Sequence, residues 1–269
     1  MTDSLFEVLK SAIAEESPVA LATIIECGDD VDSGVAVGAK ILVRPDKEPI
    51  GTFGNTDLDR VVVRDTLGEL SAGTTGVRHY GPYGEARQEG VGVFVESFAP
   101  PPQMLIFGAV DFTAALSRVA KILGYRVTVC DARPVFATTQ RFPYADEVVV
   151  DWPHRLLDKV GPELGQRDAI CVLTHDPKFD VPAVIGALKT DIGYLGAMGS
   201  RRTTDDRNRR LLEEGVTEAE LDRVLAPIGL DLGAATPEET AISICAEIIA
   251  LRSGRQAPSL RNTSGDIHS

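Results

Sequence analysis

The stretch from residue 103 to residue 131 constrains the fold of this chain more than any other. It begins with the apolar run Gln-Met-Leu-Ile-Phe, turns at Gly108, and continues over residues 112–124 with apolar side chains at helical spacing. A second apolar run follows and ends at Asp131. A strand, a glycine turn, a helix, a strand and an acidic residue about 20 positions after the glycine are typical of a dinucleotide-binding βαβ unit.

The glycine turn departs from the usual G-x-G-x-x-G pattern. Val110 stands where a second glycine normally lets a pyrophosphate approach bare backbone. Asp111 adds a negative charge at the start of the helix, where it can act as the N-cap and occupy donors that a phosphate would use. Two interpretations stay open: an altered nucleotide site that includes Gly108 and Ala109, and a Rossmann-like scaffold that has lost its site.

Apolar runs continue to alternate with helical segments after this unit. Each run is nearly continuous, which is typical of parallel strands covered on both faces. The alternation predicts an α/β fold with a right-handed, doubly wound, Rossmann-like parallel sheet. The further strands are expected at 147–151, 169–174 and 192–197, and the further helices at 153–164 and 181–189. Two later helices are indicated by capping boxes that begin at Thr217 and Thr236.

The part of the chain before residue 100 has a different pattern and predicts a smaller α+β domain. Three consecutive prolines, residues 100–102, form a stiff linker without backbone donors and mark the predicted boundary. We therefore expect an N-terminal domain at 1–99, a Rossmann-like domain at 103–255 and a flexible polar tail at 256–269. In the first domain, helices are expected at 4–14 and 58–70, and strands at 19–25, 39–43, 50–53 and 91–98.

The composition narrows the class of partner. The chain has 27 Lys and Arg against 40 Asp and Glu, a formal net charge of −13, so we expect no nucleic-acid partner and favour a basic protein surface. No apolar stretch approaches the ~20 residues that span a membrane, and the first residues lack the basic region of a signal peptide, so we expect a cytoplasmic protein. The four cysteines lack C-x-x-C spacing and are interpreted as buried thiols, and no metal site is predicted.

Polar residues follow several of the predicted strands, at the edge where doubly wound sheets bind ligands. Asp131 can accept hydrogen bonds from ribose hydroxyls, or it can form a local turn with Arg133. Arg133 can accompany a phosphorylated ligand. After another strand come Thr174, His175 and Asp176, where the histidine can serve as an acid or base that the aspartate orients. The alternative for this segment is a loop that caps the next helix.

The basic segment after the fifth predicted strand of the sheet is a candidate anion site. Ser200, Arg201 and Arg202 follow the strand, and further arginines stand at 207, 209 and 210. Guanidinium groups at a strand-to-helix junction suit a phosphate or a carboxylate. The alternative is a solvated helix whose arginines pair with neighbouring acids. No G-x-S-x-G elbow supports a hydrolase.

Six segments carry a resemblance that covers nearly the whole chain. They are Val37–Lys40, Asp131–Pro134, Arg141–Asp146, Thr174–Asp176, Gly196–Arg202 and Pro227–Glu239. Together they resemble the XdhC/CoxI family of molybdenum-hydroxylase accessory factors. The resemblance implies an N-terminal XdhC/CoxI domain, a C-terminal Rossmann domain, and a role in maturing xanthine dehydrogenase or carbon monoxide dehydrogenase. In that role the protein binds the molybdenum cofactor, protects it during sulfuration and delivers it to the apo-enzyme.

The chain departs from that family at three motifs. The family's Gly-Ala-Gly-His turn is Gly108–Asp111 here, its Ser-Gly-Gly-Cys falls on Gly54–Asp57, and its Cys-Gly-Gly falls near Arg87–Glu89. Both motif cysteines are therefore absent. Because thiolates are the soft ligands expected near molybdenum or a sulfur-loaded cofactor, the departures favour a divergent member.

Three functions follow from these observations. The first is an accessory factor that binds and transfers the molybdenum cofactor (molybdopterin), with a molybdenum hydroxylase apo-enzyme and a sulfurase as partners and a homo-oligomer as a further expectation. The second is an NAD(P)-dependent oxidoreductase, with NAD(P) binding weakened by Val110 and Asp111. The third is a scaffold or regulatory paralogue that has lost both sites. The predicted cofactor-binding residues are Gly108, Ala109, Asp131, Arg133, Thr174, His175, Ser200, Arg201 and Arg202.

Overall fold

The structure is a computed structural model that describes residues 4–28, 34–85, 88 and 90–264. The chain divides into two compact units, Met1–Pro100 and Pro101–Ser269. Of the segment 87–89, where the resemblance places a missing cysteine motif, only Gln88 lies within the described residues. None of the helices in the described ranges is long and apolar enough to cross a membrane.

The first unit is an antiparallel sheet with one helix against each face. Its strand order is β3-β2-β1-β5-β4. The strands are β1 Val19–Cys27, β2 Lys40–Val43, β3 Ile50–Gly51, β4 Gly76–Tyr80 and β5 Val91–Phe98, and the helices are α1 Leu5–Ala14 and α2 Thr56–Ala72. Successive side chains of a strand point to opposite faces, so Leu21 of β1 packs in the cluster with α1 whereas Ala22 packs in the cluster with α2.

The sequence predicted most of this unit correctly. Both helices and the strands at 19–25 and 91–98 are present, and β2 pairs with β3 as a hairpin, with Leu42 opposite Ile50. Strand β4 was not predicted, because it begins at a glycine and three of its five side chains are exposed, so it forms no apolar run. It pairs with β5 along its whole length.

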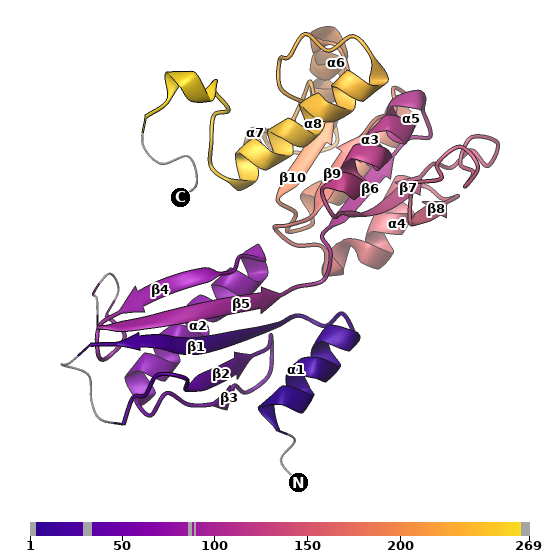
Figure 1. The fold of residues 1–269 in the computed structure, drawn as a ribbon. Coiled ribbons are helices and arrows are strands. Elements are labelled where there is room, and N and C mark those ends of the chain that lie inside the picture. Colours follow the sequence, from indigo (N-terminus) through magenta and orange to yellow (C-terminus); the bar gives the residue numbers. More distant parts are fainter. Residues whose placement is uncertain (1–3, 29–33, 86–87, 89, 265–269) are drawn as a thin grey trace. The chain divides into compact units, whose positions relative to one another are not determined.

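The second unit is a parallel sheet, as predicted, with six strands where five were expected, in the order β11-β10-β9-β6-β7-β8 (Figure 1). The strands are β6 Gln103–Phe107, β7 Arg126–Cys130, β8 Glu147–Val149, β9 Ala169–Val172, β10 Tyr194–Ala197 and β11 Val224–Leu225. From β6 the chain first adds strands on one side and then, from β9, on the other. The order therefore reverses between the neighbours β6 and β9, which is the position where doubly wound sheets place their ligand crevice.

Helices cover both faces of the parallel sheet. One face is covered by α3 Asp111–Ile122 and α8 Pro237–Arg252. The other packs against α4 Pro153–Val160, α5 Pro177–Leu188, α6 Arg201–Glu213 and α7 Glu218–Leu221. The short 3₁₀ helices η1 Gly161–Glu163 and η2 Leu260–Asn262 complete the elements. The capping boxes predicted at Thr217 and Thr236 are both present, each with reciprocal bonds to the glutamate three residues later.

Candidate functional site

Four segments meet at the carboxyl edge of the parallel sheet. They follow β6, β7, β9 and β10, which are adjacent in the sheet, and they contain Gly108, Asp131, Thr174 and Ser200, respectively. Because parallel strands end on one side, the predicted placement of Asp131, His175 and Arg201 along a common edge agrees with the topology.

Gly108 is required by its geometry. Its φ is +118°, a backbone conformation that side chains rarely adopt, and an added Cβ would lie 2.7 Å from the Thr174 Cγ2. Its N–H donates to the carbonyl of Cys130, which extends the pairing of β6 with β7 by one residue. Its carbonyl accepts the hydroxyl of Thr113, one turn into α3. The glycine thus lets the chain leave β6 in close contact with the segment that follows β9.

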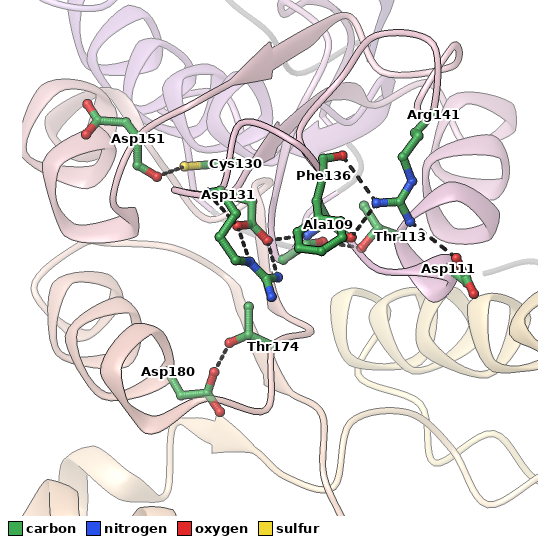
Figure 2. A network of polar contacts seen from close by, with 12 residues as sticks. Ala109, Asp111, Thr113, Cys130, Asp131, Phe136, Arg141, Asp151, Thr174 and Asp180 are labelled. Atoms are coloured by element: carbon green, nitrogen blue, oxygen red, sulfur yellow. Dashed lines mark hydrogen bonds and ion pairs between the residues drawn. The ribbon is translucent and has the colours of Figure 1, made fainter.

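Asp131 closes the turn that Gly108 opens. The residue is 3% exposed, and its carboxylate accepts the Ala109 N–H at 2.8 Å. The same carboxylate holds the Arg133 guanidinium in a fork, Nε to Oδ1 at 2.9 Å and Nη2 to Oδ2 at 2.7 Å, and accepts the Arg133 N–H at 2.9 Å. Burial alone would raise the pKa of Asp131, but the hydrogen bonds from Arg133 and Ala109 outweigh it and hold this pKa below its usual range. Figure 2 shows the Asp131 carboxylate beside Ala109.

These bonds bear on both interpretations of Asp131, and its role in binding a cofactor stays a prediction. The structure has the local turn with Arg133, in which each carboxylate oxygen already accepts two hydrogen bonds. A ribose hydroxyl would have to displace one of these donors. The Ala109 N–H, which a pyrophosphate would use in an ordinary dinucleotide turn, is occupied as well.

The prediction that Asp111 caps α3 is wrong. The N-cap is Val110, with an extended backbone (φ −112°, ψ 172°) and no side-chain cap bond, whereas Asp111 is already helical. The Asp111 side chain is 89% exposed and pairs with Arg141 at 3.3 Å. Val110 is half-buried and packs against the apolar cluster under α3. Its side chain therefore contributes to the core, and the weakening of NAD(P) binding by Val110 stays a prediction.

Arg141 is a site residue to which sequence reasoning gave no role. Its Nη1 donates to the carbonyls of Ala109 at 3.1 Å and Phe136 at 3.3 Å, and its Nη2 reaches Asp111 (Figure 2). It thereby ties the long connection after β7 to the start of α3. Only its place within the resemblance singled it out, because its partners at 109 and 111 are about 30 positions away in sequence.

Aromatic rings hold the Arg133 guanidinium at the same edge. Its central carbon lies 4.7 Å from the ring centre of Phe136 and 5.8 Å from that of Phe179. Trp152 stacks on Phe179 with the ring centres 4.8 Å apart. The Arg133 side chain remains 44% exposed. The result is a guanidinium of fixed orientation that is still open to solvent, which suits contact with an anionic or planar ligand.

The segment after β9 has the capping role that was its alternative interpretation. The Asp176 side chain accepts the Lys178 N–H at 3.0 Å and caps α5, which begins four residues before the predicted helix. His175 is exposed. Thr174 is buried and donates its hydroxyl to Asp180, one turn into α5 (Figure 2).

The basic segment after β10 divides into exposed and buried residues. The Ser200 hydroxyl caps α6 by accepting the Thr203 N–H at 3.2 Å, and Arg201 and Arg202 are exposed in the first turn. Arg207 is only 4% exposed. Arg209 pairs with Glu213 at 2.8 Å, as expected for a solvated helix face. The interpretation as a solvated helix with paired arginines thus applies to Arg209, whereas the anion site at Ser200, Arg201 and Arg202 stays a prediction.

One cysteine thiol, that of Cys130, lies at the edge. Cys130, at the end of β7, is buried and donates to the carbonyl of Asp151 at 3.3 Å. Burial raises its pKa to about 12, so it is no ready thiolate ligand. Cys171 and Cys245 are buried too, whereas Cys27 is partly exposed, contrary to an interpretation as four buried thiols. Within the described ranges, no group of three or more His, Cys, Asp or Glu residues could hold a metal ion.

Comparison with known proteins gives curated relatives, of which two have names that describe a function. The chain is 31% identical over 160 residues, 60% of its length, to a probable xanthine dehydrogenase subunit of Bacillus subtilis (strain 168). It is 26% identical over 159 residues, 59% of its length, to the molybdenum cofactor insertion chaperone PaoD of Escherichia coli (strain K12). The matches cover 46% and 43% of these proteins, so the chain spans less than half the length of each.

One solved structure and two family models complete the comparison. The crystal structure of a xanthine dehydrogenase from Bacillus halodurans matches with a TM-score of 0.52 and 22% identity over 94% of this chain and 97% of that one, which shows the fold. The model of the XdhC Rossmann domain matches residues 104–248, more than half of the 269 residues, and the model of the XdhC and CoxI family matches residues 12–81. The chain therefore belongs to the XdhC and CoxI family.

Proposed function

We propose that this chain is an accessory factor for a molybdenum hydroxylase, which binds the molybdenum cofactor at the carboxyl edge of its parallel sheet and delivers it to the apo-enzyme. The observation that carries the proposal is the match of both halves of the chain to the family's two models, together with a relative named as a molybdenum cofactor insertion chaperone. The action is binding and transfer, in the cytoplasm.

The residues at the edge fit the anionic part of the cofactor. Molybdopterin carries a terminal phosphate, and the first turn of α6 offers helix N–H groups beside the exposed side chains of Arg201 and Arg202. Arg133, which lies near the rings of Phe136 and Phe179 and is 44% exposed, can contact the planar ring system. Bound there, the cofactor would supply the redox-active metal centre that the hydroxylase requires, while this chain orients and shields it.

The same residues do not fit ligation of molybdenum by thiolate. Cys130 is the thiol at this edge, and it is buried, hydrogen-bonded and protonated at neutral pH. Asp57, where the resemblance places a motif cysteine, lies in the first turn of α2 with a 64% exposed side chain that pairs with Arg60. We therefore propose that contacts to the phosphate and ring system hold the cofactor, and that any sulfur comes from a separate sulfurase.

Dinucleotide binding is the rival function. It needs the N–H groups of the glycine turn and a free acidic acceptor after β7, and both are engaged in the contact of Asp131 with Ala109 and Arg133. The cost of breaking these bonds argues against an NAD(P)-dependent oxidoreductase. If the purified chain bound NAD(P) tightly and in preference to molybdopterin, the oxidoreductase would become the favoured function.

The test is titration of the full chain with molybdopterin and with NAD(P), using Arg201→Ala, Arg202→Ala and the matched control Arg209→Ala. A charge-assisted hydrogen bond is worth ~1.5–3 kcal/mol, so each of the first two variants should bind molybdopterin about ten- to a hundredfold more weakly. Arg209 pairs with Glu213, and its variant should bind normally. Unchanged affinity in all three folded variants contradicts the proposed site, and absence of molybdopterin binding by the unmodified chain contradicts the proposed function.

A further inference from the structure

Arg207 of α6 is a buried guanidinium whose hydrogen-bonding capacity is mostly unused. Its side chain is 3% exposed. Its Nη1 donates to the carbonyl of Met198 at 2.9 Å, and the nearest acid is Asp180, whose Oδ2 lies 3.8 Å from Nη1, too far for a hydrogen bond. Among the described residues, neither Nε nor Nη2 of Arg207 has a hydrogen-bond partner.

Arg133 shows what the unpaired Nε and Nη2 donors of Arg207 can bind. In Arg133, the Nε and Nη2 donors form a fork that holds both oxygens of the Asp131 carboxylate, at 2.9 and 2.7 Å. The same edge of Arg207 lacks such a partner and is removed from solvent. A buried donor without a partner loses its hydration and gains nothing in return, so a ligand with two adjacent oxygens would be strongly favoured there.

Other groups around Arg207 point to the same kind of ligand. Thr204 lies three positions earlier, on the same face of α6, and its buried hydroxyl also has no partner in the described part of the chain. Gly199, with φ +152°, precedes the helix, and a Cβ added to it would lie 3.1 Å from the Thr203 Cβ and 3.9 Å from the Arg207 Nη1. The backbone at Gly199 therefore passes close to both side chains, and the positive end of the 13-residue helix α6 begins there.

We propose that Arg207, Thr204 and the first turn of α6 form a subsite for a small tetrahedral oxyanion of the phosphate or sulfate class. The Arg207 fork takes two oxygens, and the Thr204 hydroxyl and the helix N–H groups take the others. The proposal stands on the unpaired donors and does not depend on the molybdenum function. Free phosphate and the phosphate end of a larger ligand share this chemistry.

The charge of Asp180 modulates the subsite. Two charged groups act on its carboxyl: Arg207 from α6 and Asp176 from the start of α5. Burial raises the pKa of Asp180 to about 7. Below that pH the carboxyl is neutral and Arg207 keeps its full attraction for an anion, whereas above it the carboxylate competes. Sulfate, which does not titrate in this range, should therefore bind more tightly at pH 6 than at pH 8.

The experiment is calorimetric titration of the full chain with sodium sulfate at pH 6 and pH 8, against a constant chloride background. Arg207→Lys keeps the positive charge but removes the fork, and Thr204→Val keeps the shape but removes the hydroxyl. Each should weaken sulfate binding about tenfold or more, since each removes charge-assisted or buried hydrogen bonds. Arg209→Lys on the exposed face is the matched control and should bind as the unmodified chain does. Asp180→Asn should remove the difference between pH 6 and pH 8.

Two results overturn the proposal. The first is no sulfate binding by the unmodified chain, which is expected if ordered water alone satisfies these donors. The second is unchanged sulfate affinity in Thr204→Val together with folded Arg207→Lys. If Arg207→Lys fails to fold, Thr204→Val decides by itself. Where sulfate does bind, competition with molybdopterin assigns the subsite to the phosphate of the cofactor. Additive binding assigns it to a free oxyanion and contradicts the placement of the cofactor's phosphate on the first turn of α6.

Discussion

At the scale of single residues, Gly108 and Asp180 show opposite kinds of constraint. Gly108 is fixed by backbone geometry and by the close approach of Thr174, whatever ligand binds nearby. Asp180 is fixed by what surrounds it: a threonine hydroxyl, a guanidinium at 3.8 Å and otherwise a dry interior. The first constraint is independent of pH, and the second changes with protonation.

Replacing Gly108 by alanine should destabilise the chain. A positive φ costs a non-glycine residue ~1–3 kcal/mol, and the added Cβ would clash with Thr174, so we expect a loss of at least this size in the free energy of unfolding, measured by urea denaturation. Gly68→Ala is the matched control. Gly68 lies within α2 with no atom near its absent Cβ, so alanine should be neutral or stabilise the helix by ~0.5–1 kcal/mol. Equal effects of the two changes would contradict the geometric argument.

Titration of the Asp180 carboxyl should lower the free energy of unfolding as the pH rises. Its pKa is raised from 3.8 to about 7 in the folded chain, so the folded state binds more protons than the unfolded state between these values. The stabilisation is complete below pH ~4 and is lost as pH rises through 7, by at most about 4 kcal/mol at ~1.4 kcal/mol per pKa unit. Asp180→Asn should become more stable relative to the unmodified chain over this window. The quantity to measure is the difference in free energy of unfolding between Asp180→Asn and the unmodified chain, because the contributions of the other carboxyl groups are the same in both. A difference that does not change from pH 4 to pH 8 would contradict the burial argument.

At the scale of elements, Arg141 is one of the side chains that tie the connection between β7 and β8 to the start of α3. Arg141 joins the carbonyls of Ala109 and Phe136, so it fastens the loop 131–146 to the start of α3. Arg141→Ala should leave the sheet intact but speed amide hydrogen exchange in this loop by about five- to tenfold, because net hydrogen bonds of ~1 kcal/mol each are lost. Arg118→Ala, which removes only a contact 5.4 Å from the Tyr144 ring centre, is the control and should change exchange little. Faster exchange spread equally over all strands would instead indicate general destabilisation.

The elements also show what sequence patterns can and cannot predict. Long apolar runs predicted β6, β7 and β9 because both faces of those strands are buried. Strand β11 was missed because its two residues, Val224–Leu225, are too few to show a periodic apolar pattern.

The sequence predicted where the residues of the candidate site lie, but not what each of them contacts. Strand ends in a parallel sheet identified the edge and its residues, but the roles depend on contacts between distant segments. The bond from Ala109 to Asp131 spans 22 positions, and the contact of Arg207 with Asp180 joins two helices. No local pattern distinguishes Arg207, which is buried, from Arg209, which is solvated on the same helix.

At the scale of the whole molecule, the apolar clusters indicate how the chain is divided. The clusters of the parallel sheet contain residues from Met104 onward, and those of the antiparallel sheet contain residues up to Phe98. No cluster of the described residues includes side chains from both sheets. Each unit thus has a core of its own, which is the condition for independent folding.

A shortened chain of residues 103–255 should therefore be soluble and unfold in one cooperative transition. It keeps every strand of the parallel sheet and the helices on both faces, while it omits the proline linker and the segment after 255. Urea denaturation followed by tryptophan fluorescence, from Trp152, and by circular dichroism should give coincident curves. The same shortened chain should retain the sulfate affinity of the full chain, because Arg207, Thr204 and Asp180 all lie within it. An aggregated or non-cooperative product would mean that the parallel sheet needs the first hundred residues to fold, and the boundary at the prolines would be wrong.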